Sequence, residues 1–156
     1  CLQVAKGESV WGLATHGGTV LYLCLEDNFT RIQNRLFQIT DDAPETLHFA
    51  TIAAGIGEGL EEQLTSFLTQ HPDTSLVVID TLQRVRNTND SGNPYANDYR
   101  DISVLKALAD KHHIAILLIH HLRKLNDDDP MNMISGTTGI SGATDSNFVL
   151  KERTVI

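Results

Sequence analysis

The sequence predicts an α/β domain with a mostly parallel sheet and helices on both faces of that sheet. Apolar, β-rich segments alternate with segments whose apolar residues recur at helical spacing. The β-rich segments are nearly continuous in Val, Ile and Leu, which is typical of strands that are buried on both faces. A chain of 156 residues has the length of one ordinary domain, so we expect a single core over residues 1–156.

Five segments have the composition of strands. Gly17 and Gly18 precede the first segment, and Pro44 precedes the second, as turn signals between elements. The five segments are 19–27, 46–52, 75–80, 114–121 and 146–153. Strands that are separated by helices of 10 to 15 residues pair in parallel, so we expect their carboxyl ends to lie at one edge of the sheet.

Three segments between these strands predict helices with one apolar face. The apolar stripes are Ile32, Leu36 and Ile39 in 29–39; Leu60, Leu64, Phe67 and Leu68 in 59–71; and Ile102, Leu105 and Ala109 in 99–113. The opening residues 1–11 have the apolar spacing of the end of a helix.

The composition excludes several classes of protein. No run approaches the roughly 18 apolar residues of a membrane span, and no charged-then-apolar leader opens the chain. We therefore expect no membrane partner and a cytoplasmic location. A net charge of -8 argues against a surface that binds nucleic acid throughout, although it allows a local basic site. Cys1 and Cys24 lack metal-ligand spacing, so we expect buried thiols in a reducing compartment.

Polar residues stand where three of the predicted strands end. Glu26 and Asp27 end the first strand, Asp80 and Thr81 end the third, and His120 and His121 end the fourth. In open α/β sheets the ligand crevice lies outside the carboxyl ends of the strands. Each polar end could instead cap the helix that follows, and for Asp27 or Asn28 we prefer that interpretation. Three such ends on neighbouring strands favour a functional site.

Four segments in this order resemble a known family. They are LEDN at 25–28, VVIDTLQR at 77–84, LLIHHLRK at 117–124 and SGTTGISGATDSNFVLKER at 135–153. Together they resemble the RecA-like P-loop ATPase core of hexameric replicative helicases of the RepA type, with its mobile-element and phage relatives. The resemblance implies that ATP is the substrate and that Mg²⁺ is the cofactor. It also implies a homo-oligomeric ring that moves on single-stranded DNA.

The resemblance also implies roles for individual residues. Glu26 matches the glutamate that polarises the attacking water, and Asp80 matches the aspartate of the magnesium site, with Thr81 as its support. His121 matches the polar residue that senses the γ-phosphate. A core histidine that is satisfied by a backbone carbonyl is the alternative for His121.

Basic residues of the last predicted strand and of two loops complete the resemblance. Arg153 matches the arginine finger that reaches a neighbouring subunit, and Lys151 matches its helper, although both could be solvated charges. We interpret Arg84 and Arg86 as surface charges, with contact to a neighbouring subunit as the alternative. The candidate DNA contacts are Arg123, Lys124, Ser135, Gly136, Thr137 and Thr138. The acidic run 127–129 would repel a DNA backbone if it faced the same channel.

One departure from the family is large. The sequence contains no G-x-x-x-x-G-K-[ST] loop, the element that cradles phosphates. We expect that loop and the first strand ahead of residue 1, so that the chain as it stands is a truncated, inactive core that binds ATP weakly or not at all. The alternative is that some other segment fills the gap. Two alternatives stay open: a regulatory or loader ATPase that unwinds nothing, and a non-catalytic assembly module.

Overall fold

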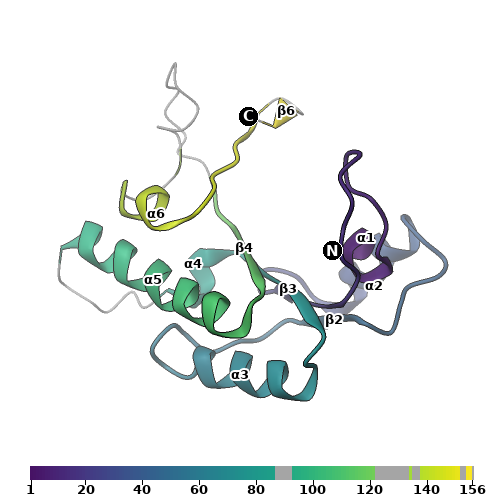
Figure 1. Ribbon diagram of the computed structural model, residues 1–156, viewed down its shortest axis with the longest axis horizontal. Helices are drawn as coiled ribbons and strands as arrows, with labels where there is room; N and C mark the ends of the chain where they lie inside the picture. Colours follow the sequence, from purple (N-terminus) through teal and green to yellow (C-terminus); the bar gives the residue numbers. More distant parts are fainter. Residues whose placement is uncertain (87–92, 122–133, 135–137, 152–153, 156) are drawn as a thin grey trace.

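A four-stranded parallel sheet organises the chain (Figure 1). The computed structural model describes residues 1–86, 93–121, 134, 138–151 and 154–155. The strands are β1 (Thr19–Cys24), β2 (Leu47–Ala50), β3 (Thr74–Asp80) and β4 (Ala115–Ile119), in the spatial order β2-β1-β3-β4. The α/β class and four of the five predicted strands are thereby confirmed. The pairing places Asp80 level with Cys24 in β1 and with Ile119 in β4.

The expectation of a fifth strand over 146–153 in this sheet was wrong. Residues 146–149 form no strand, while β5 (Leu150–Lys151) and β6 (Thr154–Val155) pair antiparallel as a separate sheet. The physical reason lies in Asn147, whose side chain donates to the carbonyl of Ser141 at 3.1 Å and accepts from the hydroxyl of Thr144 at 2.9 Å. These hydrogen bonds hold the chain in a bend at residues 144–145, immediately before the segment for which the composition predicted a strand.

The described residues contain six helices. They are α1 (Leu2–Lys6), α2 (Phe29–Phe37), α3 (Leu60–Gln70), α4 (Leu82–Val85), α5 (Pro94–His112) and α6 (Thr138–Ala143). The helix predicted from residue 99 begins at Pro94, because Asn93 accepts a hydrogen bond from the Tyr95 backbone N–H and proline suits a first helical position. The helix expected over 1–11 ends at Lys6, where Gly7 adopts a left-handed conformation with φ 68°. Neither α4 nor α6 was predicted.

The hydrophobic core lies between one face of the sheet and the helices α3 and α5. Leu21 and Leu23 of β1 and Val77 and Ile79 of β3 supply the sheet side of this core. The helix side consists of Leu60, Leu64 and Leu68 from α3 and Ile102, Leu105 and Leu108 from α5. Of the predicted stripes, Leu60, Leu64, Leu68, Ile102 and Leu105 are buried, whereas Phe67 and Ala109 are half-buried. Leu108 is buried although it was not predicted.

Helices α1 and α2 lie on the opposite side of the sheet from α3, so both faces carry helices (Figure 1). Of the stripe predicted for 29–39, Ile32 is buried and Leu36 is half-buried, but Ile39 lies beyond the end of α2 and is exposed. Over β4 this second face is open, since Leu117 and Ile119 are both exposed. The predicted cover on both faces is therefore complete for β1 and partial for β4.

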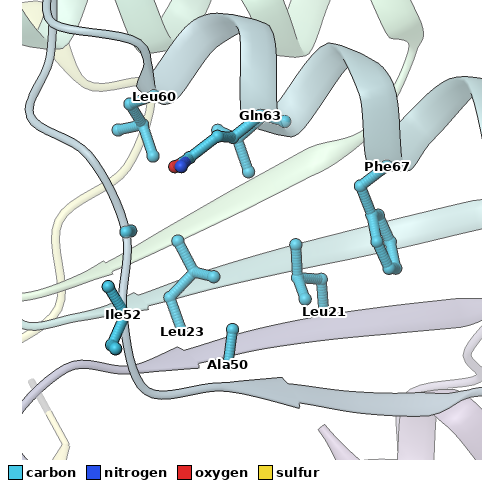
Figure 2. A pocket seen from close by; sticks show the side chains of 9 residues that line it. Leu21, Leu23, Ala50, Ile52, Leu60, Gln63 and Phe67 are labelled. Atoms are coloured by element: carbon cyan, nitrogen blue, oxygen red, sulfur yellow. The ribbon is translucent and has the colours of Figure 1, made fainter.

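A pocket of about 170 Å³ lies between α3 and the strands β1 and β2 (Figure 2). Its apolar lining includes Leu21, Leu23, Ala50, Ile52, Leu60 and Phe67. Gln63 is the polar exception, and its side-chain oxygen accepts a hydrogen bond from the backbone N–H of Ala54 at 2.9 Å. Asp80 points to the other face of the sheet, where it contacts Tyr22, so the pocket and the polar strand ends are separate features.

The structure describes two features that the composition predicted: the length of the apolar helices and the burial of the two thiols. None of the helices in the described ranges combines the length and the apolar composition that crossing a membrane requires. Cys24 is buried, as expected, whereas Cys1 is exposed. Cys1 precedes the short helix α1, none of whose residues is buried. The prediction of two buried thiols therefore holds for Cys24 alone.

We expect Leu64→Ala to lower the free energy of unfolding by about 2 to 5 kcal/mol, because it removes a side chain that is 2% exposed and leaves a cavity in the core. Leu13→Ala is the matched control, since Leu13 is 70% exposed. Urea unfolding followed by circular dichroism measures both variants. An unchanged midpoint for Leu64→Ala would contradict the location of the core between α3 and the sheet.

Candidate active site

Polar residues from three neighbouring strands meet at the carboxyl edge of the sheet. Glu26 follows β1, Asp80 ends β3, and His121 lies two residues after β4. Nε2 of His121 is 3.9 Å from Oε2 of Glu26. Both side chains are open to solvent, at 71% and 44% exposure respectively. Of the two histidines, His121 is thus the one that lies beside Glu26, and a bound molecule could reach both groups.

Thr81 joins the end of β3 to Glu26. Its hydroxyl donates to Oε1 of Glu26 at 3.1 Å, and its side chain is buried. The peptide bond between Asp80 and Thr81 is cis. Thr81 was expected only to support Asp80, but its contact is with the carboxylate on the neighbouring strand. One oxygen of Glu26 is therefore held, while the other faces His121.

Tyr22 holds Asp80 in the same way, and sequence reasoning missed it. The Tyr22 hydroxyl donates to Oδ2 of Asp80 at 2.7 Å. Burial raises the pKa of Tyr22, and the hydrogen bond and the negative charge of Asp80 raise it further. The parallel register holds a signal for this contact: Cys24 pairs with Asp80, and Tyr22 lies two residues earlier on the same face of β1.

Arg84 lies against Glu26, which the interpretation as a surface charge did not anticipate. Its Nε atom is 3.4 Å from Oε1 of Glu26, although 57% of the arginine side chain is exposed. Arg84 belongs to α4, the turn that begins directly after Thr81. The carboxylate oxygen that accepts from Thr81 thus also faces a guanidinium group.

Arg86 is a half-buried charge that pairs with buried acids, so its interpretation as a surface charge was wrong. Its guanidinium contacts the carboxylate of Asp98, and its Nε is 3.6 Å from Oδ2 of Asp101. Both aspartates lie on α5 and are buried. Buried charges are stable only when they are paired, and here the Arg86 guanidinium faces both carboxylates, while Arg100 is a second partner of Asp101 at 3.6 Å. This ion cluster holds the segment after β3 against α5.

The polar residues after Glu26 serve local structure, as we preferred. The side chain of Asn28 accepts a hydrogen bond from the backbone N–H of Arg31 at 2.9 Å and caps α2. Asp27 forms ion pairs with Arg31 and Arg35 on that helix. These contacts leave Glu26 as the acid of this strand end that faces the other two strands.

The oxygen atoms at this edge suit a hard divalent cation. Asp80 supplies a carboxylate, with the Thr81 hydroxyl and the Glu26 carboxylate nearby, and Mg²⁺ prefers such donors. Within the described ranges no group of three or more His, Cys, Asp and Glu side chains could enclose a metal ion. Mg²⁺ commonly uses one or two carboxylates together with substrate phosphates, so Asp80 fits an ion that arrives with a nucleotide.

Several candidate residues are not brought to this edge by the part of the chain that the structure describes. Thr138 is the exposed first residue of α6, and Lys151 lies in β5, away from the four-stranded sheet. The remaining candidates lie outside the described residues: Arg123, Lys124, Ser135, Gly136, Thr137 and Arg153. Their predicted roles stay predictions.

Comparisons with known proteins bear on the whole arrangement. Residues 1–127 match the sequence model of a family described as an AAA domain. The matched range includes Glu26, Asp80 and His121, and it ends before the segments 135–138 and 151–153. No curated protein matches the chain significantly.

We expect the folded chain to lose stability as the pH rises above about 9, partly through Cys24. Burial, followed by the negative charges of Asp80 and Asp27, raises the pKa of this thiol from 9.0 to about 12. Between these values the unfolded chain releases a proton that the folded chain keeps, which costs up to about 1.4 kcal/mol per pH unit.

Urea unfolding at several pH values under reducing conditions measures this dependence. Cys24→Ala should flatten it, because the replacement cannot ionise. Cys1→Ala is the control, since it removes the other cysteine of the chain, which is exposed. Equal pH dependence in Cys24→Ala and the unsubstituted chain would contradict the burial of this thiol beside Asp80.

Proposed function

This chain belongs to the AAA domain family, and from that premise we propose that it is the ATPase core of a RepA-type replicative DNA helicase. In this proposal, ATP hydrolysis drives a homo-oligomeric ring, hexameric by resemblance, along single-stranded DNA in the cytoplasm. One observation carries the proposal: Glu26, Asp80 and His121 lie where three neighbouring parallel strands end, which is where open α/β sheets bind their ligands. Family membership by itself supports an ATPase-type domain.

In the proposed reaction, Glu26 is the general base. Oε2 of Glu26 and Nε2 of His121 are 3.9 Å apart, close enough for one water molecule to contact both. Glu26 takes the proton of that water as the water attacks the γ-phosphorus of ATP, the bond from this phosphorus to the β–γ bridging oxygen breaks, and ADP leaves with that oxygen. His121 donates a hydrogen bond to the γ-phosphate. Asp80, held by Tyr22, would bind Mg²⁺, which neutralises charge on the phosphates.

Two elements of the proposed enzyme lie beyond these residues. Since the sequence contains no G-x-x-x-x-G-K-[ST] loop, the proposal requires that an element outside residues 1–156 binds the phosphates. Arg153, with Lys151 as its helper, is assigned to the site of the neighbouring subunit, where a guanidinium group stabilises charge on the transferred phosphoryl group.

The proposed DNA contacts lie in the segment between β4 and α6 and at the start of α6. Arg123 and Lys124 supply positive charge, and residues 135–138 supply small side chains whose backbone N–H groups can contact phosphates. The acidic run 127–129 would have to face away from the DNA backbone.

We expect Glu26→Gln to lower kcat for ATP hydrolysis by the full-length gene product by about 10²- to 10⁴-fold, because the amide cannot accept the proton of the attacking water. Phosphate release at saturating Mg·ATP measures this rate. Glu62→Gln, an exposed acid on α3, is the control and should retain the full rate. If Glu26→Gln retained it as well, the general-base assignment would be abandoned.

We expect the full-length gene product to unwind a forked DNA duplex when ATP is supplied, with the signal lost in Glu26→Gln. A strand-displacement assay with a fluorescent, quenched duplex measures this activity. ATP hydrolysis without strand displacement would contradict the helicase assignment and favour a loader or regulatory ATPase. Neither hydrolysis nor displacement would favour an assembly module.

A further inference from the structure

The turn after β3 connects the two acids of the candidate site through Arg84. Asp80 ends β3, Thr81 follows it, and Arg84 lies three residues further on in α4. We propose that Arg84 is a positioning residue for Glu26: together with Thr81 it holds Oε1, so that Oε2 is the oxygen that takes the proton of the attacking water. This inference rests on the proposed function, because it assigns Arg84 a part in that reaction.

The first step in the argument is that this turn is fixed to the core. Leu82 and Val85 are 1% and 0% exposed. The backbone N–H of Ile56 donates to the carbonyl of Val85 at 2.7 Å, and the N–H of Arg84 donates to the carbonyl of Thr81 at 3.0 Å. The backbone from which Arg84 projects is therefore anchored to the core on both sides of this residue.

The second step is the asymmetry of the Glu26 carboxylate. Oε1 lies 3.1 Å from the Thr81 hydroxyl and 3.4 Å from Nε of Arg84, whereas Oε2 lies 3.9 Å from His121. An oxygen whose lone pairs already face two hydrogen-bond donors is poorly placed to take a proton from water. The less engaged oxygen faces the imidazole, so the two donors determine which oxygen of Glu26 acts as the base.

The third step is that Arg84 contributes little to folding through this contact. More than half of its side chain and 44% of the Glu26 side chain are exposed, and ion pairs between exposed groups add little to stability. We therefore expect replacement of Arg84 to change the reaction and to leave the stability of the fold nearly unchanged.

The kinetic test uses the full-length gene product. We expect Arg84→Gln to lower kcat by about 10- to 100-fold with KM for Mg·ATP unchanged, and Arg84→Lys to recover part of the loss. Arg31→Gln is the matched control, since Arg31 is equally exposed but pairs with Asp27, the residue next to Glu26. Because Arg84 acts through Glu26, the double variant Glu26→Gln/Arg84→Gln should be no slower than Glu26→Gln alone.

A second measurement tests the contact without hydrolysis. In the ¹H–¹⁵N NMR spectrum of the full-length gene product, the Arg84 Nε–H signal should shift in Glu26→Gln and stay in place in Glu62→Gln. The role of Arg84 would be overturned if its Nε–H signal did not move in Glu26→Gln. It would also be overturned if Arg84→Gln kept its full kcat, whether or not KM rose. Such results leave the proposed function standing if Glu26→Gln is inactive. Absence of hydrolysis in the unsubstituted protein would overturn both proposals.

Discussion

The register of β1, β3 and β4 is the constraint on which the candidate site depends. It sets Cys24, Asp80 and Ile119 side by side, so the residues that follow these three strands leave the sheet at the same edge. A shift of one residue in β3 would move Asp80 to the opposite face, away from Tyr22. It would also remove the Thr81 hydroxyl from Glu26. Backbone pairing in the sheet therefore decides which polar side chains meet.

The alternation of strand residues separates stability from chemistry within β1. Leu21 and Leu23 face α3 and α5, where burial of apolar surface stabilises the fold. Tyr22 and Cys24 face the other way and lie near Asp80, where burial and negative charge both raise their pKa values. The phenol and the thiol stay neutral there, which leaves the negative charge of this region on the carboxylates.

Patterns along the chain predicted most of the fold and the identity of the strand-end residues, but few of their contacts. Strand composition and helical stripes are local properties, so β1 to β4, α2 and α3 could be located from them. The start of α5 depends on Asn93 and Pro94, which also read as loop residues. The prediction of a strand from residue 146 was wrong because the Asn147 side chain forms hydrogen bonds with Ser141 and Thr144. Partners such as Arg84 and Glu26 are separated by many residues, and only the register brings them together.

Arg84 and Arg86 are two arginines that lie close together after β3 but face different acids. Arg86 lies inward between Asp98 and Asp101, where removal of the guanidinium would take a positive charge away from two buried carboxylates and destabilise the fold. Arg84 lies outward beside Glu26, where solvent screens the charge and the fold depends on it little. A defect caused by replacing Arg86 would therefore report on folding, whereas a defect at Arg84 would report on the carboxylate that it faces. The two residues are close in sequence, so burial rather than residue type decides what each arginine contributes.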